Sequence, residues 1–209
     1  MKKMTEENVK AAFAGESQAH IKYLAFSEKA AAEKLPNIAR AFKANALAEQ
    51  IHAMNHLKTL GGIGTTKGNL DAAVGGENFE VEEMYPAYLV VAQAQGEKTA
   101  EMFFNWALAA EKVHAGIYRG ARSAVESGRD IDFKPVHVCS FCGFTMEGDA
   151  PDKCPVCGTP KNTFVTFGKG VPGRFRWPSI RNWRPGRSWA WPFGPRSTPP
   201  LSTRGSRSG

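Results

Sequence analysis

Residues 106–114 read Trp-Ala-Leu-Ala-Ala-Glu-Lys-Val-His, which places Glu111 and His114 three positions apart behind a run of apolar and small side chains. Side chains at this spacing share one face of a helix, with their Cβ atoms ~5–6 Å apart. A carboxylate on an apolar, inward-facing surface is costly unless a cation compensates its charge. The stretch therefore predicts a helix whose inward face carries two metal ligands.

Three further segments carry ligand-type residues on similar surfaces. The spacing recurs as Glu49-x-x-His52 behind Ala-Leu-Ala, Glu16 follows a small and apolar run, and Glu77-x-x-Glu80 adds a pair of glutamates. One Glu-x-x-His alone occurs by chance on solvated helices, and an acidic surface with two hydrogen-bonded histidines is the alternative interpretation. Glu from each of two helices plus Glu-x-x-His from each of two others is, however, the inward ligand set of dinuclear carboxylate bundles. We predict a dinuclear site, with iron or manganese favoured over zinc by the hard oxygen ligands and the imidazoles.

Four long helices are predicted from their start and stop residues, at about Glu6–Lys34, Pro36–Gly61, Glu77–Gln95 and Lys98–Ser127. Very short turns make the first and last pairs antiparallel hairpins. A Gly- and Thr-rich link of about 15 residues, 61–76, joins the hairpins and is long enough for a crossover along the bundle. This arrangement predicts an all-α, ferritin-like four-helix bundle. Pro86 is expected to kink or offset the first turns of the third helix.

All four cysteines lie in a second, smaller unit, as the pairs Cys139-x-x-Cys142 and Cys154-x-x-Cys157. Such pairs suit a metal site in a reducing compartment better than a secreted disulfide framework. Four thiolates in a tetrahedron bind either zinc or a single redox-active iron. The spacing leaves both metals open, and the neighbouring two-metal site favours iron because one-electron chemistry is useful beside it.

The net charge of +7 comes from the end of the chain. Residues 169–209 hold nine of the 27 basic residues and no acidic one, so the remainder carries 18 basic against 20 acidic residues, a net charge of −2. We predict a bundle domain at 1–132, a cysteine module at 133–167 and a disordered basic tail at 168–209. An Arg and aromatic patch for nucleic acid or membrane is the alternative for the tail.

A cytoplasmic protein that binds neither nucleic acid nor membrane is expected. The N-terminal lysines are followed by no apolar run of the signal-peptide type. The sequence also has no apolar stretch of the ~18 or more residues that a membrane-spanning helix needs.

The motifs together resemble the rubrerythrin family over about residues 5–167. The resemblance is carried by Phe-Ala-Gly-Glu-Ser-Gln-Ala at 13–19, by Glu77-x-x-Glu80 before Glu-Met-Tyr-Pro at 83–86, and by the terminal four-cysteine module. Glu80 is the most specific mark, because other ferritin-like di-iron proteins usually have one glutamate there and lack the cysteine module. The resemblance implies a small rubredoxin-like β module that binds one iron through its four cysteines.

The family's functional residues can be carried over position by position. The resemblance implies that Glu49 and Glu111 bridge two irons, with Glu16 on one iron and Glu77 and His114 on the other. Glu80 and His52 would be alternative ligands of the first iron, Glu80 when it is oxidised and His52 when it is reduced. Tyr23 and Tyr85 match tyrosines that lie beside the irons, although both could also be core aromatics with a hydrogen-bonded hydroxyl.

The implied activity is a non-haem di-iron peroxidase, which reduces hydrogen peroxide to water with electrons delivered through the rubredoxin-like iron. A redox donor protein or reductase would supply these electrons. His114 lies ~20 Å along its helix from Gly128, and a linker of about ten residues reaches at most ~35 Å. A head-to-tail homodimer, with each cysteine module beside the partner's site, is therefore expected. The alternatives are a ferritin-like ferroxidase or iron-handling protein, and a bundle with a zinc ribbon that serves as an adaptor.

Overall fold

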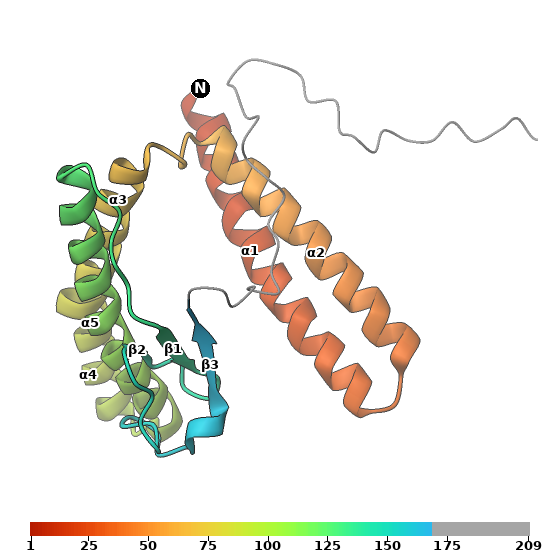
Figure 1. Ribbon diagram of the computed structural model, residues 1–209. Helices are drawn as coiled ribbons and strands as arrows, with labels where there is room; N and C mark the ends of the chain where they lie inside the picture. The colour runs from red at the N-terminus through yellow and green to blue at the C-terminus, as the bar shows by residue number, and fades with distance from the viewer. Residues whose placement is uncertain (169–209) are drawn as a thin grey trace, which may run out of the picture. The chain divides into compact units, whose positions relative to one another are not determined.

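The computed structural model describes residues 1–168 as four long helical segments followed by a small β module (Figure 1). The tail predicted at 168–209 falls, apart from Gly168, outside the described residues. Within residues 1–168, no helix has both the length and the apolar character needed to cross a membrane. The predicted domain boundaries stay predictions.

The first hairpin consists of α1 (Lys3–Ala32) and α2 (Pro36–Thr59). The turn between them has Lys34 in the left-handed region at φ 61°, and the Leu35 N–H donates to the Ala30 carbonyl at 2.9 Å. Pro36 then starts α2, where a missing N–H costs nothing. Small buried side chains lie along the hairpin, which allows the two helices to approach closely: Ala30, Ala39, Ala46 and Ala53.

The second hairpin pairs a composite helical segment with α5 (Lys98–Glu126). The composite segment is α3 (Thr66–Phe79), a π-helical turn (Glu80–Met84) and α4 (Tyr85–Gln95). In the π-turn the Tyr85 N–H donates to the carbonyl of Glu80, five residues back. Pro86 follows directly and has no N–H to continue an α-helical ladder. The offset expected at Pro86 therefore takes the form of this π-turn.

The link between the hairpins differs from the prediction. The structure starts α3 at Thr66, so the link is residues 60–65 and not 61–76. The Thr65 side chain caps the helix by accepting the Gly68 N–H at 3.2 Å, and the Asn69 side chain accepts the Gly64 N–H at 2.8 Å. These local bonds define where the helix starts, even though each glycine in it costs ~1 kcal/mol.

A crossover along the bundle cannot be made by so short a link. Six residues span at most ~21 Å when extended, whereas the 24 residues of α2 rise ~36 Å. The predicted crossover is therefore wrong. The predicted fold class, a ferritin-like four-helix bundle followed by a small metal-binding β module, is confirmed.

The cysteine module is a three-stranded antiparallel sheet in the order β2-β1-β3. Its strands are β1 (Val136–Cys139), β2 (Thr145–Glu147) and β3 (Phe164–Phe167), with a 3-10 turn at Lys161–Thr163. The ring nitrogens of buried His137 lie 2.9 Å from Thr166 Oγ1 and 2.7 Å from the Gly148 carbonyl. These contacts hold the strands together, and β2 lies against α5.

Replacing the α3 cap tests why the helix starts where it does. We expect Thr65→Ala to lower the free energy of unfolding by about 1 kcal/mol, because the Gly68 N–H loses its acceptor. Urea denaturation of the metal-free protein, followed by circular dichroism, measures the change. Thr66→Ala is the matched control and should cost less, since it leaves the Thr65 hydroxyl in place. Equal stability of the two variants would contradict the capping role.

Candidate metal centres

The first candidate centre lies on the α1–α2 hairpin. Ligand atoms of Glu16, Glu49 and His52 all lie within 4.8 Å of one another. His52 Nδ1 is 3.0 Å from Glu49 Oε2, and the Glu49 side chain is 19% exposed whereas that of His52 is 52% exposed. The hydrogen bond with Glu49, with burial and charge repulsion adding to it, raises the pKa of Glu16. The carboxyl groups of Glu16 and Glu49 therefore lie close together beside the imidazole of His52.

The second candidate centre lies on the other hairpin and has the same composition. It brings together Glu77 from α3 with Glu111 and His114 from α5, again within 4.8 Å. His114 Nδ1 lies 2.6 Å from Glu111 Oε2 and 3.7 Å from Glu77 Oε2. Burial first, and then the contact with Glu111, raises the pKa of Glu77 to about 7.

The donor atoms of both groups fit metal ions. Glu77 Oε2 is buried and has no hydrogen-bond partner, although it faces Glu111 and His114. An unpaired buried carboxylate oxygen is costly, and a cation bound between these side chains would remove the cost. Carboxylate oxygens and imidazole nitrogens are ligands that suit iron.

Of the seven predicted carboxylate and histidine ligands, six fall into these two groups of three. Glu80 belongs to neither group, but it lies close enough to Glu111 that burial and this neighbour's charge raise its pKa. Burial was expected for all seven, but six are only partly buried, and His52 is exposed over half of its side chain. The bridging roles of Glu49 and Glu111 stay predictions.

The two predicted tyrosines lie in different surroundings. Burial, followed by the charges of Glu111, Glu80 and Glu77, raises the pKa of Tyr85. Tyr23 packs its ring against Phe26 and Phe42, at centroid distances of 6.3 and 6.1 Å. A role for either tyrosine beside irons stays a prediction.

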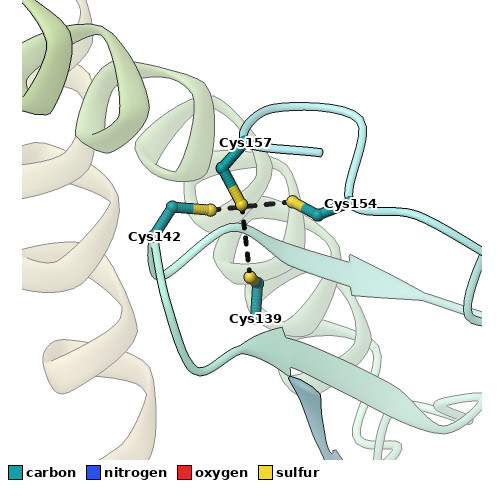
Figure 2. Close-up of side chains that lie close together, drawn as sticks. All are labelled: Cys139, Cys142, Cys154 and Cys157. Carbon is teal, nitrogen blue, oxygen red and sulfur yellow. Dashed lines mark hydrogen bonds between the residues drawn. The ribbon is translucent and has the colours of Figure 1, made fainter. Parts of the chain in front are cut away.

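The four cysteine sulfurs converge on one point, as Figure 2 shows. Sγ of Cys139 lies 3.7 Å from that of Cys157, and Sγ of Cys142 lies 3.6 Å from that of Cys154. These separations exceed the ~2.05 Å of a disulfide. They approach the ~3.8 Å edge of a tetrahedron whose metal–sulfur bonds are ~2.3 Å. The geometry is that of a four-thiolate metal site.

The thiols differ in acidity because their hydrogen bonds differ. Burial opposes ionisation of Cys139, but bonds from the Thr159 hydroxyl and from the N–H groups of Cys142 and Phe141 lower its pKa to about 6. Burial and the neighbouring sulfurs raise the pKa of Cys142. A bound cation would allow all four to be thiolates at once.

Two threonines near these centres were not predicted from the sequence. Thr159 Oγ1 lies 3.3 Å from Cys139 Sγ and 3.1 Å from Cys157 Sγ. Thr145 Oγ1, which is on β2, lies 2.8 Å from His114 Nε2 on α5. Thr159 follows a cysteine knuckle closely and could have been suspected, whereas the Thr145 contact joins residues 31 positions apart and has no sequence signal.

Comparison with known proteins assigns the family. The family model described as rubrerythrin matches residues 7–122. The chain belongs to the rubrerythrin family. The model of the rubrerythrin rubredoxin-like domain matches residues 137–165, a range that includes all four cysteines. The cysteine cluster is thus the rubredoxin-like iron site of a rubrerythrin, and the carboxylate–histidine groups suit a di-iron centre.

Known relatives cover most of the chain. Rubrerythrin-2 of Clostridium acetobutylicum is 40% identical over 178 residues, covering 78% of this chain and 97% of the relative. Nigerythrin of Nitratidesulfovibrio vulgaris is 37% identical, covering 78% and 86% respectively. A solved structure of nigerythrin in its fully reduced state aligns with a TM-score of 0.46 at 35% identity, covering 78% of this chain and 86% of that one. This membership makes the protein an oxidoreductase by family.

Removing one thiolate tests the rubredoxin-like site. We expect iron-loaded protein to be red, as ferric four-thiolate sites are, and Cys154→Ser to lose that colour because three thiolates no longer complete the tetrahedron. Visible absorption together with iron content per chain measures the loss. Ser140→Ala should keep the colour, because Ser140 lies between two ligands without being one. A colourless iron-loaded wild-type protein would contradict an iron site.

Removing one carboxylate tests the second centre. We expect Glu111→Gln to weaken cobalt(II) binding at the carboxylate–histidine groups, because it removes a direct ligand. The loss should exceed the factor of about 10–100 that is typical when a residue behind a metal ligand is replaced. Glu28→Gln is the control, because Glu28 is exposed on α1 and belongs to neither group. Titration followed by cobalt absorption gives both affinities, and equal values would contradict a ligand role for Glu111.

Proposed function

We propose that this rubrerythrin is a peroxidase, which reduces hydrogen peroxide to water with electrons that pass through its rubredoxin-like iron. The observation that supports the proposal most directly is the occurrence of two metal-binding chemistries in one chain, with β2 of the cysteine module lying on α5, the helix of Glu111 and His114. A one-electron site beside a two-metal site has the parts needed for a two-electron reduction.

Each hairpin supplies the ligands for one metal ion. We assign Glu16, Glu49 and His52 to one iron, and Glu77, Glu111 and His114 to the other. Glu49 and Glu111 would each reach the second ion as well, as bridging carboxylates do. Glu80 stands beside Glu111 without joining either group, which suits an alternative ligand that exchanges with the exposed His52.

Peroxide takes up two electrons and two protons to become two molecules of water. When bound, two irons would supply the electrons and the positive charge that allow the O–O bond to break. The protein supplies half-buried carboxylates there, and we assign the Tyr85 hydroxyl, whose pKa is raised by burial and by the charges of these carboxylates, as the hydrogen-bond donor to a peroxide oxygen. A redox donor protein or reductase would restore the electrons.

A ferritin-like ferroxidase is the second candidate, because the same carboxylate groups could bind and release iron as a substrate. That function would leave the cysteine module without a use.

The cytoplasmic location and the head-to-tail homodimer stay predictions. The exposed apolar side chains of Phe26, Phe79 and Phe103 are of the kind that a partner subunit would cover.

The choice of oxidant tests the proposal. We expect peroxide to restore the red ferric colour of chemically reduced, iron-loaded protein much faster than dissolved oxygen does. Stopped-flow absorption measures both rates, with Glu28→Gln as a control that should behave like the wild-type protein. Glu111→Gln should lose the response to peroxide. Faster reaction with oxygen, accompanied by accumulation of iron beyond the stoichiometric content, would instead favour the ferroxidase.

A further inference from the structure

A threonine hydroxyl contacts two of the four cysteine sulfurs. Thr159 Oγ1 lies 3.1 Å from Sγ of Cys157 and 3.3 Å from Sγ of Cys139. Hydrogen bonds to sulfur reach such lengths because sulfur is a larger atom than oxygen. The two sulfurs belong to different cysteine pairs and lie 3.7 Å apart, along a contact that Figure 2 marks with a dashed line. The hydroxyl of Thr159 therefore lies against one edge of the sulfur cluster.

Hydrogen bonds of the backbone and of a second threonine fix the position of Thr159. Its carbonyl accepts the Cys154 N–H at 2.7 Å, and the Gly158 N–H donates to the Cys154 carbonyl at 2.8 Å. Gly158 takes the left-handed conformation in this turn, with φ 75°. The Thr163 hydroxyl donates to Thr159 Oγ1 at 3.3 Å. The carbonyl of Thr159 thus closes the knuckle of Cys154 and Cys157, while its hydroxyl contacts the sulfurs.

The direction of the hydrogen bond follows from the chemistry of a metal-bound cysteine. Such a cysteine is a thiolate, so its sulfur carries no proton and can only accept. Thr159 Oγ1 already accepts the proton of the Thr163 hydroxyl. The proton of Thr159 itself is then left for the two sulfurs, which are its remaining partners in the described part of the chain. With metal bound, the Thr159 hydroxyl is therefore the donor and a thiolate is the acceptor.

A hydrogen bond to a thiolate favours the reduced form of a four-thiolate iron site. The ferrous site carries one more negative charge than the ferric site, so a donated proton stabilises the ferrous site more strongly. Hydrogen bonds to the sulfurs are one of the means by which a protein sets the reduction potential of such a site. Cys139 is only 1% exposed, so water does not readily replace a lost donor at this sulfur.

We propose that Thr159 raises the reduction potential of the iron bound by the four cysteines, because its hydroxyl donates to the sulfurs of Cys157 and Cys139. Thr159 is a positioning residue, since it acts through the ligands of the iron. In the reaction that it favours, ferric iron gains one electron from a redox donor protein or reductase and becomes ferrous, and the hydroxyl proton stays on Thr159. Weaker reductants can then supply the site. The inference goes beyond the proposed function, because it does not depend on which oxidant the protein uses.

The midpoint potential of the red ferric colour tests this role. The full-length, iron-loaded protein is reduced stepwise in an electrochemical cell while its visible absorption is recorded. We expect Thr159→Val, which keeps the shape but removes the hydroxyl, to have a lower potential than the wild-type protein. At a fixed electrode potential its ratio of ferrous to ferric iron should fall by on the order of tenfold, which corresponds to about 59 mV for one electron. A wild-type or higher potential in Thr159→Val would overturn the proposal.

Two matched variants separate the hydroxyl bond from the packing of the module. Thr159→Ser should keep a potential close to the wild-type value, because the hydroxyl remains. Ser140→Ala removes an exposed hydroxyl from the same module and should leave the potential unchanged. If Thr159→Ser has the low potential of Thr159→Val, or if Ser140→Ala shifts the potential as much, the effect belongs to packing and the proposal is wrong.

NMR of the cadmium-loaded wild-type protein needs no variant, so it decides the matter even if Thr159→Val fails to fold. Cadmium-113 has a nuclear spin and can replace iron at four thiolates. We expect the Thr159 hydroxyl proton to show a scalar coupling to the cadmium, because the hydrogen bond to sulfur connects the two nuclei. Absence of this coupling would overturn the assignment of Thr159 as the donor.

Neither measurement uses peroxide, so the outcomes are distinguishable from those for the proposed function. A protein that does not react with peroxide would disprove the peroxidase, and the potentials of the Thr159 variants would still decide the role of the hydroxyl. A wild-type potential in Thr159→Val would disprove the role of Thr159 and leave the peroxidase proposal standing.

Discussion

Repulsion between half-buried carboxylates is the constraint on which this structure depends. Glu77, with a side chain only 16% exposed, shares its space with Glu111, and Glu80 stands close by. Helices fix the backbone positions of these residues because the backbone satisfies its own hydrogen bonds, so the carboxylates can separate only by rotation of their side chains. This repulsion contributes to the raised pKa values of Glu16, Glu77 and Glu80. Glu49 pairs with His52, and Glu111 pairs with His114. Cations bound between these side chains would remove the repulsion more completely.

Much of the centre could be predicted from spacing alone. Glu49-x-x-His52 and Glu111-x-x-His114 lie on helices whose starts and stops are marked in the sequence, and the structure brings each pair together with one further glutamate. The cysteine pairs were equally informative, because four thiolates at short spacing have few uses other than a metal. Proximity of these side chains can be predicted where they lie on one helix or one knuckle, because the spacing alone then brings them together.

The failures have a common cause, which is competition between local and longer-range interactions. The glycine-rich run at 61–76 suggested a loop, but the Thr65 cap and the Asn69 side chain start a helix inside it. His52 was expected to be buried, and its exposure depends on how the helical surfaces pack. Thr145 carries no signal at all, because its importance arises only when β2 lies on α5.

The short link at 60–65 has one carboxylate of each ligand group at a similar distance along the helix on either side of it. Glu49 lies ten residues before the end of α2 at Thr59, and Glu77 lies eleven residues after the start of α3 at Thr66. At 1.5 Å per residue both carboxylates stand ~15–17 Å from the link. Each residue inserted between the link and either carboxylate would move that carboxylate ~1.5 Å further along its helix and would remove this equality of distance.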